Sequence, residues 1–352
     1  MTRGRHPTIA DIAAKAGVAP MTVSRVINGS NVVSPGLRGR VEAAIRELDY
    51  SPNRLARGLK RQRTNVIGIL LPDVSNPYSG ELTAGIQSVL LDRGFSFFVA
   101  TTDRSAGREV AALKAFFDHR MDGIVLATRP SQKGDEEIAR FLARHYPMVA
   151  IGRDVVSGTI DRVSCRNHEG AFAAVEHLAA LGHRRIAFLG VAYEQGFKLE
   201  RFQGYVKALA HFGIGLEPRL VIGPGAADSP GFSTQVDGYQ GTRVLLGLEE
   251  KPTAIFARND FTAFGALRAA RDLGFAVPDD LSIVGFDDVP LAAFTAPPLT
   301  TVAQPIAEQG RCAAELLLER IEGVEGERRE ILFDCELMVR DTTGPCRDVH
   351  VS

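Results

Sequence analysis

The sequence predicts two kinds of structure in one chain: a small all-α helix-turn-helix module at the N-terminus, and a larger α/β region with parallel sheets in two lobes. Three observations predict this. Two short helical patterns flank a glycine turn near the N-terminus, positive charge is concentrated in residues 1–63, and apolar strands alternate with amphipathic helices from Val66 onward. The two regions therefore differ in both fold and charge.

The first predicted helix begins after Thr8, whose hydroxyl is suited to an N-cap. Asp11 follows three residues later, where a carboxylate completes a capping box. Ile9, Ile12 and Ala13 share one apolar face, and Gly17 supplies the permissive backbone for a turn. The pattern predicts a short helix that ends at this turn.

Two further helices complete the predicted module. Pro20 suits the first position of the second helix, which needs no backbone N–H. Because Val23 and Val26 point inward, the outward face consists of Met21, Thr22, Ser24, Arg25 and Asn28. A third helix opens at Ser34-Pro35 and presents an apolar stripe formed by Leu37, Val41, Ala44, Ile45 and Leu48.

The charge distribution separates this module from the rest of the chain. Residues 1–63 contain 12 Lys and Arg against 4 Asp and Glu, a net charge of +8. The whole chain carries −1, so residues 64–352 carry −9. Such asymmetry is expected when one end of a chain meets phosphates. Together with the polar outward face of the second helix, it indicates a module that binds double-stranded DNA.

Length and composition are typical of a multidomain protein with a large core. The chain has 352 residues, of which 45% are hydrophobic. No apolar run approaches the ~20 residues that span a bilayer, and the N-terminus lacks a signal-peptide pattern, so we expect a cytoplasmic protein with no membrane partner. Four scattered cysteines do not have zinc-site spacing and are expected to be reduced structural thiols, with no metal or cofactor. They are Cys165, Cys312, Cys335 and Cys346.

Beyond Val66, buried strands and amphipathic helices alternate. The pattern predicts strands at 66–72, 95–101, 122–127, 148–152, 185–191, near 221, 253–257 and 281–286. It predicts helices at 80–93, 106–117, 135–144, 168–181, 198–212, 239–247 and 261–273. Continuous apolar strands joined by helices favour parallel sheets covered on both faces. Two such sets indicate two lobes with a cleft between them.

Several spaced motifs closely resemble the lactose/galactose repressor family. They include Thr22-Val-Ser-Arg-Val-Ile-Asn28, Leu48-Asp-Tyr-Ser-Pro-Asn53-Arg-Leu-Ala56, Glu176–Arg184, Val284-Gly-Phe-Asp-Asp288 and Pro298–Val302. The resemblance spans nearly the whole chain. It implies a DNA-binding domain over 1–52, a hinge over 53–64, a two-lobed periplasmic-binding-protein-like domain over 65–340, and a C-terminal tail over 341–352. It also implies a sequence-specific transcriptional repressor that binds operator DNA and a small effector.

The resemblance assigns base reading to the second helix. Pro20, Met21 and Arg25 match outward specificity positions, and Arg25 is best suited to a guanine edge. Met21 offers apolar contact, for example with a thymine methyl group. The remaining polar positions are expected to contact phosphates; they are Thr8, Thr22, Ser24 and Asn28.

The basic segment 53–63 has two interpretations. It is either a charged linker or, as the resemblance implies, a hinge that becomes helical on operator DNA and pairs with its dimer mate. Leu59 matches the residue that wedges into the minor groove, and Asn53, Ala56 and Arg57 match neighbouring hinge positions. Gly58 departs from the pattern. The helical state of this residue is less favourable than that of Ala by about 1 kcal/mol, so Gly58 lowers the helicity of the segment.

Polar residues at predicted strand ends point to a ligand cleft. The resemblance places Arg201, Asn259, Asp287 and Gln304 at effector-contacting positions, together with Tyr78 and Arg153, which match less closely. Asp, Arg and Asn together suit a sugar or polyol, although an isolated Asp or Asn can also be a simple loop cap. Arg153 stands where the lactose-responsive member has a carboxylate, so a sugar acid or sugar phosphate is an alternative effector.

Two other classes of function are less consistent with the sequence. A secreted sugar-binding protein would share the cleft but needs an export signal and would lack the basic module. An enzyme would need a catalytic motif, yet no nucleophile elbow, HExxH or Walker-type loop is present, and His177 on an apolar helix fits a structural role. Because one recognition helix covers a half-site and the C-terminus has no leucine heptad, we expect a homodimer.

Overall fold

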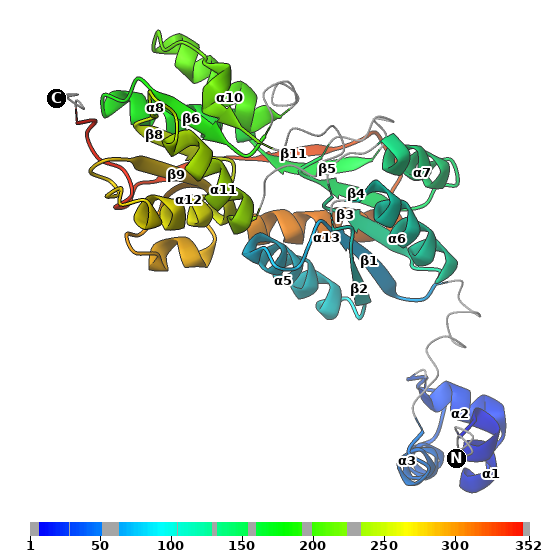
Figure 1. Ribbon diagram of the computed structural model, residues 1–352. Helices are drawn as coiled ribbons and strands as arrows, with labels where there is room; N and C mark the ends of the chain where they lie inside the picture. The colour runs from blue at the N-terminus through cyan, green and yellow to red at the C-terminus, as the bar shows by residue number, and fades with distance from the viewer. Residues whose placement is uncertain are drawn as a thin grey trace. The chain divides into compact units, whose positions relative to one another are not determined.

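The computed structural model describes residues 7–27, 29–50, 63–103, 105–128, 132–153, 160–191, 199–223 and 234–347. The chain divides into two compact units, residues 1–64 and 65–352 (Figure 1). Five residues with predicted DNA contacts lie outside the described residues: Asn28, Asn53, Ala56, Arg57 and Leu59. Within the described ranges, no helix is long and apolar enough to cross a membrane.

The smaller unit contains three helices, α1 (Ile9–Ala16), α2 (Pro20–Ile27) and α3 (Pro35–Glu47). The predicted capping box is confirmed, because Thr8 and Asp11 exchange side-chain and backbone hydrogen bonds at the start of α1. Gly17 ends α1 with a φ of 62°, and Arg40 of α3 donates a hydrogen bond to its carbonyl, 3.1 Å away. A shared core includes Ile12, Ala13, Ala16, Val23, Val26, Val33, Val41 and Ala44.

The larger unit contains two sheets. The first has six parallel strands in the order β11-β5-β4-β3-β1-β2. Its strands are β1 (Val66–Leu71), β2 (Ser96–Thr101), β3 (Gly123–Leu126), β4 (Met148–Ile151), β5 (Asp161–Cys165) and β11 (Glu330–Phe333). One face packs against α5 (Pro77–Asp92) and α13 (Ile306–Glu322). The other packs against α6 (Ala106–Asp118) and α7 (Gln132–Leu142). We call this sheet with its helices lobe A.

Lobe B is built around a second sheet in the order β12-β10-β9-β8-β6-β7, in which only the β10–β12 pair is antiparallel among the described strands. Its strands are β6 (Ile186–Leu189), β7 (Val221–Ile222), β8 (Ala254–Ala257), β9 (Ser282–Asp287), β10 (Thr300–Ala303) and β12 (Glu336–Met338). Helices α8 (Asn167–Ala180) and α10 (Glu200–His211) cover one face. Helices α11 (Gln235–Leu246) and α12 (Asp260–Asp272) cover the other, and the short helices η1 (Pro218–Leu220) and η2 (Pro290–Phe294) complete the lobe.

Glycines permit the closest helix contacts in both lobes. A Cβ atom at Gly85 of α5 would lie 2.1 Å from the carbonyl oxygen of Ala307 in α13. A Cβ atom at Gly265 of α12 would lie 2.0 Å from the carbonyl oxygen of Gln235 in α11. Side chains cannot be accommodated at such separations without moving backbone. The α5–α13 and α11–α12 pairs therefore depend on small residues at their crossing points.

The two lobes are joined by three short segments, which we call the crossovers. The first runs from β5 to α8, the second from β10 to α13 and the third from β11 to β12. Each lobe therefore contains parts of the chain that are far apart in sequence, as Figure 1 shows by the red strands that enter both sheets. The predicted two-lobed architecture with largely parallel sheets is confirmed.

The segment after residue 340, which the sequence set apart as a C-terminal tail, is attached to lobe B. Thr342 is fully buried, and its hydroxyl donates to the carbonyl oxygen of Ile283 at 2.7 Å while accepting from the backbone N–H of Thr300 at 2.8 Å. The backbone N–H of Cys346 donates to the carbonyl oxygen of Leu181 at 2.8 Å. Residues 341–346 thus extend the fold of lobe B.

Candidate functional site

The outward face of α2 is the candidate DNA-reading surface. Pro20, Met21 and Arg25 are exposed, and the Met21 side chain shows 60% of its surface to solvent. Thr22 and Ser24 are half-buried on the flanks of this face. Val23 and Val26 are buried against α1 and α3. The helix therefore has one face committed to the core and another available to a groove.

Thr8 has a different local role from the residues on α2. Its hydroxyl donates to the Asp11 carboxylate at 2.7 Å and accepts from the Asp11 backbone N–H at 3.3 Å. These bonds fix the start of α1. A phosphate contact by Thr8 would therefore be made by a residue that already caps a helix.

A second candidate site lies where the crossovers join the lobes, and we call Arg201, Asp287 and Gln304 the polar cluster. Arg201 extends from α10, Asp287 ends β9 and Gln304 follows β10 on the second crossover. The Asp287 carboxylate accepts from the Gln304 amide at 2.6 Å, and its oxygen lies 3.1 Å from an Arg201 guanidinium nitrogen. Three of the predicted effector residues are thus in direct contact.

Arg201 is held from three further sides. Its guanidinium donates to the Asn167 side-chain oxygen at 2.8 Å and to the Arg258 carbonyl oxygen at 2.7 Å. The guanidinium carbon lies 3.6 Å from the centroid of the Phe286 ring, which is a close cation–π contact. Nevertheless, 19% of the Arg201 side chain is exposed. The group is therefore oriented in advance and still accessible to a ligand.

Asp287 combines burial with an unusual backbone. Its φ of 121° lies in a region that L-residues rarely adopt, and Asp288 follows with a φ of 54°. Burial raises the pKa of Asp287, and the Arg201 guanidinium opposes that effect. Strained backbone of this kind often occurs at functional sites, where surrounding contacts hold it in place. Here the contacts with Arg201 and Gln304 hold the carboxylate.

Tyr78 belongs to the surroundings of the polar cluster. It is the second residue of α5 and is half-buried. Burial raises the pKa of the Tyr78 phenol, and the nearby Asp287 carboxylate raises it further. The phenol therefore remains protonated and can donate a hydrogen bond.

Asn259 acts as a helix cap. Its side-chain oxygen accepts from the backbone N–H of Thr262 at 2.9 Å at the start of α12. The residue is 7% exposed. This geometry matches the loop-cap alternative for a polar residue at a strand end, and it occupies one of the two groups that Asn259 offers to a ligand.

Arg153 does not carry free positive charge at the ends of the lobe A strands. Its guanidinium lies 2.6 Å from a Glu109 carboxylate oxygen and 2.5 Å from an Asp135 oxygen, and it also contacts the Thr128 hydroxyl at 2.6 Å. The side chain is fully buried. Two carboxylates and one guanidinium leave this cluster with a formal charge of −1, so the geometry gives no support to a site for an acidic effector. The sequence could not reveal these partners, because Glu109 is 44 residues away.

Besides Arg258 and Phe286, which contact Arg201, sequence reasoning missed two further residues that touch the polar cluster. Asn167 orients Arg201, and the Cys165 thiol donates to the Gln304 side-chain oxygen at 3.0 Å. Both residues lie at the first crossover, between β5 and α8. Strand β5 was not predicted, so its junction with α8 gave no signal.

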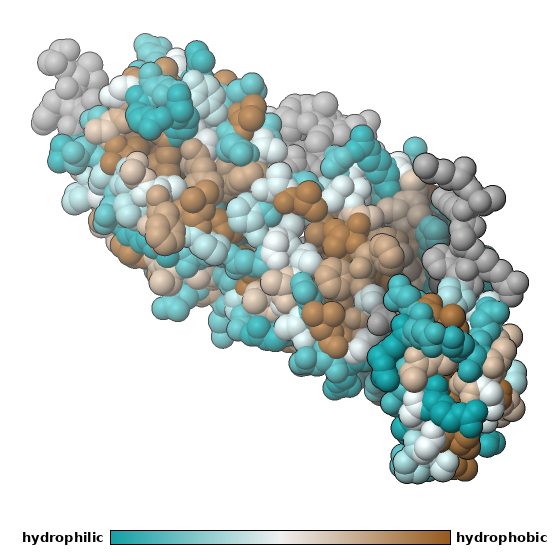
Figure 2. All heavy atoms as spheres, turned by 90° about the horizontal axis from the view of Figure 1, so that it is seen from below, coloured by the Kyte–Doolittle hydropathy of each residue, from teal (hydrophilic) through white to brown (hydrophobic). Residues whose placement is uncertain are grey.

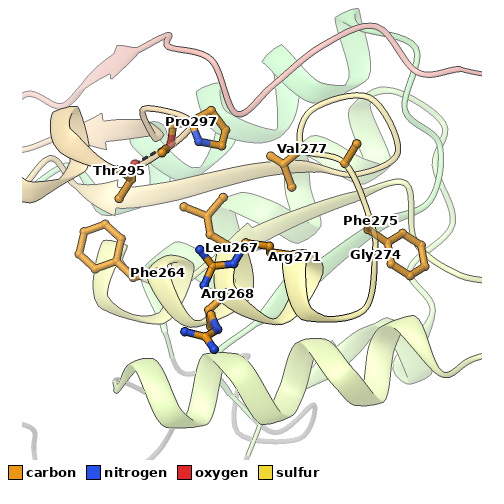
Figure 3. A pocket seen from close by; sticks show the side chains of 11 residues that line it. Phe264, Leu267, Arg268, Arg271, Gly274, Phe275, Val277, Thr295 and Pro297 are labelled. Carbon is orange, nitrogen blue, oxygen red and sulfur yellow. Dashed lines mark hydrogen bonds between the residues drawn. The ribbon is translucent and has the colours of Figure 1, made fainter.

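The surface of the larger unit carries exposed apolar groups. Figure 2 shows hydrophobic patches on the face seen from below. Exposed side chains include Leu91, Phe98 and Val99 around α5 and the edge strand β2, and Leu273, Leu291 and Phe294 on lobe B. A pocket beside α12, shown in Figure 3, is lined by Phe264, Leu267, Arg268, Arg271, Phe275, Val277, Thr295 and Pro297 among others. Within the described residues, no group of His, Cys, Asp and Glu could hold a metal ion.

Comparisons with known proteins agree with this architecture. Residues 8–53 match the model of bacterial regulatory proteins of the lacI family, and residues 175–343 match a periplasmic binding protein-like domain. The chain is 37% identical to the HTH-type transcriptional regulator DegA of Bacillus subtilis over 343 residues, covering 96% of this chain and 98% of that protein.

Solved structures give the same result. The lac repressor dimer bound to operator and the anti-inducer ONPF has a TM-score of 0.83 and 30% identity, covering 97% of this chain and all of that one. The complex of transcriptional regulator CelR with cellobiose has a TM-score of 0.70 and 33% identity, covering 96% and 99%. With a relative above 30% identity along almost its full length, the chain belongs to the lacI family of bacterial regulatory proteins.

Proposed function

We propose that this regulator represses transcription by binding a near-palindromic operator as a homodimer, and that a small neutral carbohydrate-like effector bound at the polar cluster controls the affinity for DNA. The observation that carries the proposal is the exposed polar face of α2 on a compact unit within a segment of charge +8. The relatives and structural neighbours of this chain named above are transcriptional regulators rather than enzymes.

DNA recognition is assigned to α2. Arg25 is exposed, long and permanently charged, so it can donate two hydrogen bonds to a guanine edge in the major groove. Met21 contributes apolar contact, Pro20 sets the start of the helix, and Thr22 and Ser24 contact phosphates. The basic groups supply a sequence-independent affinity that falls with salt.

The polar cluster supports a neutral effector with several hydroxyl groups. Asp287 accepts hydrogen bonds, Arg201 donates them and the Tyr78 phenol donates another, which together match the hydroxyls of a sugar. Because Arg153 is neutralised by Glu109 and Asp135, a phosphate or carboxylate would meet no unpaired cation from Arg153. The CelR complex contains cellobiose, which is consistent with this class of ligand.

The crossovers connect effector binding to DNA binding. Gln304 belongs to the polar cluster and lies on the second crossover, and Cys165 at the first crossover contacts it, so a ligand there is sensitive to the angle between the lobes. A ligand changes the operator affinity only to the extent that it binds the two lobe arrangements unequally. In the segment outside the described residues, we propose that Leu59 wedges into the operator centre, with Asn53, Ala56 and Arg57 along the minor groove.

The exposed apolar residues support dimerisation through the larger unit. Phe98 and Val99 lie on β2, whose outer edge has no neighbouring strand in the described sheet. The pocket beside α12 offers a second apolar surface on lobe B. The structural neighbour with a TM-score of 0.83 is a dimer on its operator. A two-fold protein matches the two-fold symmetry of a palindromic site.

Operator binding is tested by selecting sequences from a pool of random DNA duplexes with the full chain, then measuring fluorescence anisotropy on the selected duplex. Arg25→Ala should weaken binding and relax the preference at one base pair in each half-site, by about 1–3 kcal/mol of discrimination. Arg46→Ala removes the same charge from the exposed side of α3 and should reduce affinity equally for all sequences. If both variants lost the same affinity for matched and mismatched duplexes, Arg25 would not be a residue that recognises a base.

Effector binding is tested by thermal shift with a panel of mono- and disaccharides including cellobiose, sugar acids and sugar phosphates. A ligand at 100 times its Kd stabilises the protein by about 2.7 kcal/mol. Arg201→Ala and Asp287→Ala should each abolish the shift caused by a positive compound while operator binding persists. Arg219→Ala, which changes an exposed arginine of lobe B, is the matched control and should retain it. Stabilisation by sugar phosphates alone would contradict a neutral effector.

A further inference from the structure

Two cysteines meet at the crossovers. Cys165 is the last residue of β5, and Cys335 lies between β11 and β12 on the third crossover. In the pairing of β5 with β11, Cys165 lies opposite Phe333, which is two residues before Cys335. The backbone N–H of Arg166 continues the pairing by donating to the Phe333 carbonyl oxygen at 2.8 Å. The first and third crossovers therefore run side by side, and each of the two thiols shifts the pKa of the other.

The surroundings of the two thiols differ. Cys165 is 2% exposed and donates to the Gln304 side-chain oxygen. Cys335 is partly exposed and packs against the core of lobe B. The other two cysteines lie elsewhere: Cys312 is within α13, and Cys346 is in the segment that is attached near Leu181. All four thiols are free.

The influence of the two thiols on each other gives them different roles. The Cys165 thiol and the Arg201 guanidinium lower the pKa of Cys335, against the opposing effect of burial. The Cys335 thiol and burial raise the pKa of Cys165. Cys335 is thus the accessible thiol with the greater tendency to ionise, and ionised thiols are the nucleophiles.

We propose that Cys165 and Cys335 form a peroxide-sensitive modification site, at which hydrogen peroxide converts the two thiols into a disulfide that joins the first and third crossovers. The Cys335 thiolate attacks a peroxide oxygen, the O–O bond breaks, and the released hydroxide takes a proton to become water. The Cys165 thiol then attacks the Cys335 sulfenic sulfur, the S–O bond breaks, and a second water leaves. The two thiols lose two electrons and two protons, and the peroxide is reduced to water.

Disulfide formation changes the polar cluster as well as the crossovers. Cys165 loses the proton that it donates to Gln304, and Gln304 in turn holds Asp287. A covalent link between two of the three crossovers also restricts changes in the angle between the lobes. This regulatory consequence rests on the proposed function, whereas the disulfide itself does not.

The test treats the full chain with hydrogen peroxide at neutral pH, blocks remaining thiols with iodoacetamide, and analyses unreduced peptides by mass spectrometry. We expect a peptide that links Cys165 to Cys335 and disappears on reduction, while Cys312 and Cys346 remain alkylated. The link should be lost in Cys165→Ser and in Cys335→Ser, and in Cys165→Ser the sulfenic acid should be trapped at Cys335 by dimedone.

Two outcomes would overturn the proposal. One is that all four cysteines are alkylated after peroxide treatment of the folded protein. The other is that Cys335 is oxidised in the wild type without any link to Cys165. The measurement contains neither DNA nor effector, so its failure is distinct from a failure of the proposed regulation. If the link forms, operator titrations with oxidised and reduced protein then measure its effect on the response to an effector.

Discussion

Asp161 provides a sharp test of how lobe A is held together. The residue opens β5 and is 1% exposed. Its carboxylate accepts two hydrogen bonds at 2.9 Å from Arg320 of α13, one at 2.8 Å from the Arg329 side chain and one at 2.8 Å from the Arg329 backbone N–H. One carboxylate therefore binds both α13 and the start of β11 to β5. The substitution Asp161→Asn keeps the size of the side chain and removes its charge.

The expected loss follows from these contacts. Hydrogen bonds from Arg320 and Arg329 lower the pKa of Asp161 from 3.8 to about 2 despite its burial. This shift corresponds to about 2 kcal/mol of folding free energy at neutral pH. Breaking a buried ion pair typically costs ~3–5 kcal/mol, but both arginines are partly exposed, at 19% and 34%, and can be solvated. We therefore expect Asp161→Asn to lower the free energy of unfolding by about 2–4 kcal/mol.

Urea unfolding of the full chain, followed by far-ultraviolet circular dichroism, measures this loss. Because the folded-state pKa lies below the unfolded value, the contribution is complete above pH 4 and disappears as the pH falls from 3.8 towards 2. The difference in the free energy of unfolding between wild type and Asp161→Asn should become smaller over that pH range. Asp272→Asn, which removes an exposed carboxylate paired with Arg268, is the control and should change stability little. Equal stabilities of Asp161→Asn and wild type at pH 7 would refute the reasoning.

Three further predictions concern packing, titration and capping. Gly85→Ala should destabilise the larger unit by about 1–3 kcal/mol in urea unfolding, because its Cβ would overlap the α13 backbone. Gly80→Ala on the same helix meets no atom within 4 Å and should be neutral or slightly stabilising, because Ala has the higher helix propensity. A loss of equal size at Gly80 would contradict the steric explanation. Burial lowers the pKa of His183 below 6.5, so the unfolded chain binds a proton that the folded chain does not. The free energy of unfolding should therefore fall as the pH drops through 6.5, and it should fall less steeply in His183→Gln. Parallel pH profiles of wild type and variant would contradict this. Thr8→Ala should cost the smaller unit about 1 kcal/mol, measured by its thermal unfolding, whereas Ser34→Ala should cost less because Ser34 makes no side-chain cap bond.

Much of the fold follows from local patterns. The alternation of buried strands with helices correctly predicts the elements from β1 to β4 and from α8 to β9, since both periodicities are visible in short stretches. Strand β5 escapes detection because its sequence Asp161-Arg-Val-Ser-Cys165 includes two charged residues within five buried positions. Their charges are paired by arginine and glutamate side chains from other elements, up to 168 residues away. No local pattern carries that information.

The candidate sites show the same division. The family motifs predict Arg201, Asp287 and Gln304, which the fold brings into contact. The same motifs cannot indicate that Arg153 is neutralised, because its partners come from α6 and α7. In the smaller unit, periodicity places Leu37 in the buried stripe, yet 36% of its surface is exposed because a three-helix core is too small to cover every apolar position.

The crossovers also affect the order in which the protein can fold during synthesis. The three helices of the smaller unit bury their shared core using residues before position 51, so this unit can fold while the rest of the chain is still being translated. Neither lobe has that freedom. Lobe A lacks β11 until the ribosome has passed residue 333, and lobe B lacks β12 until it has passed residue 338. The nascent chain therefore carries a folded basic unit ahead of two incomplete sheets, whose last strand positions are filled only near the end of translation.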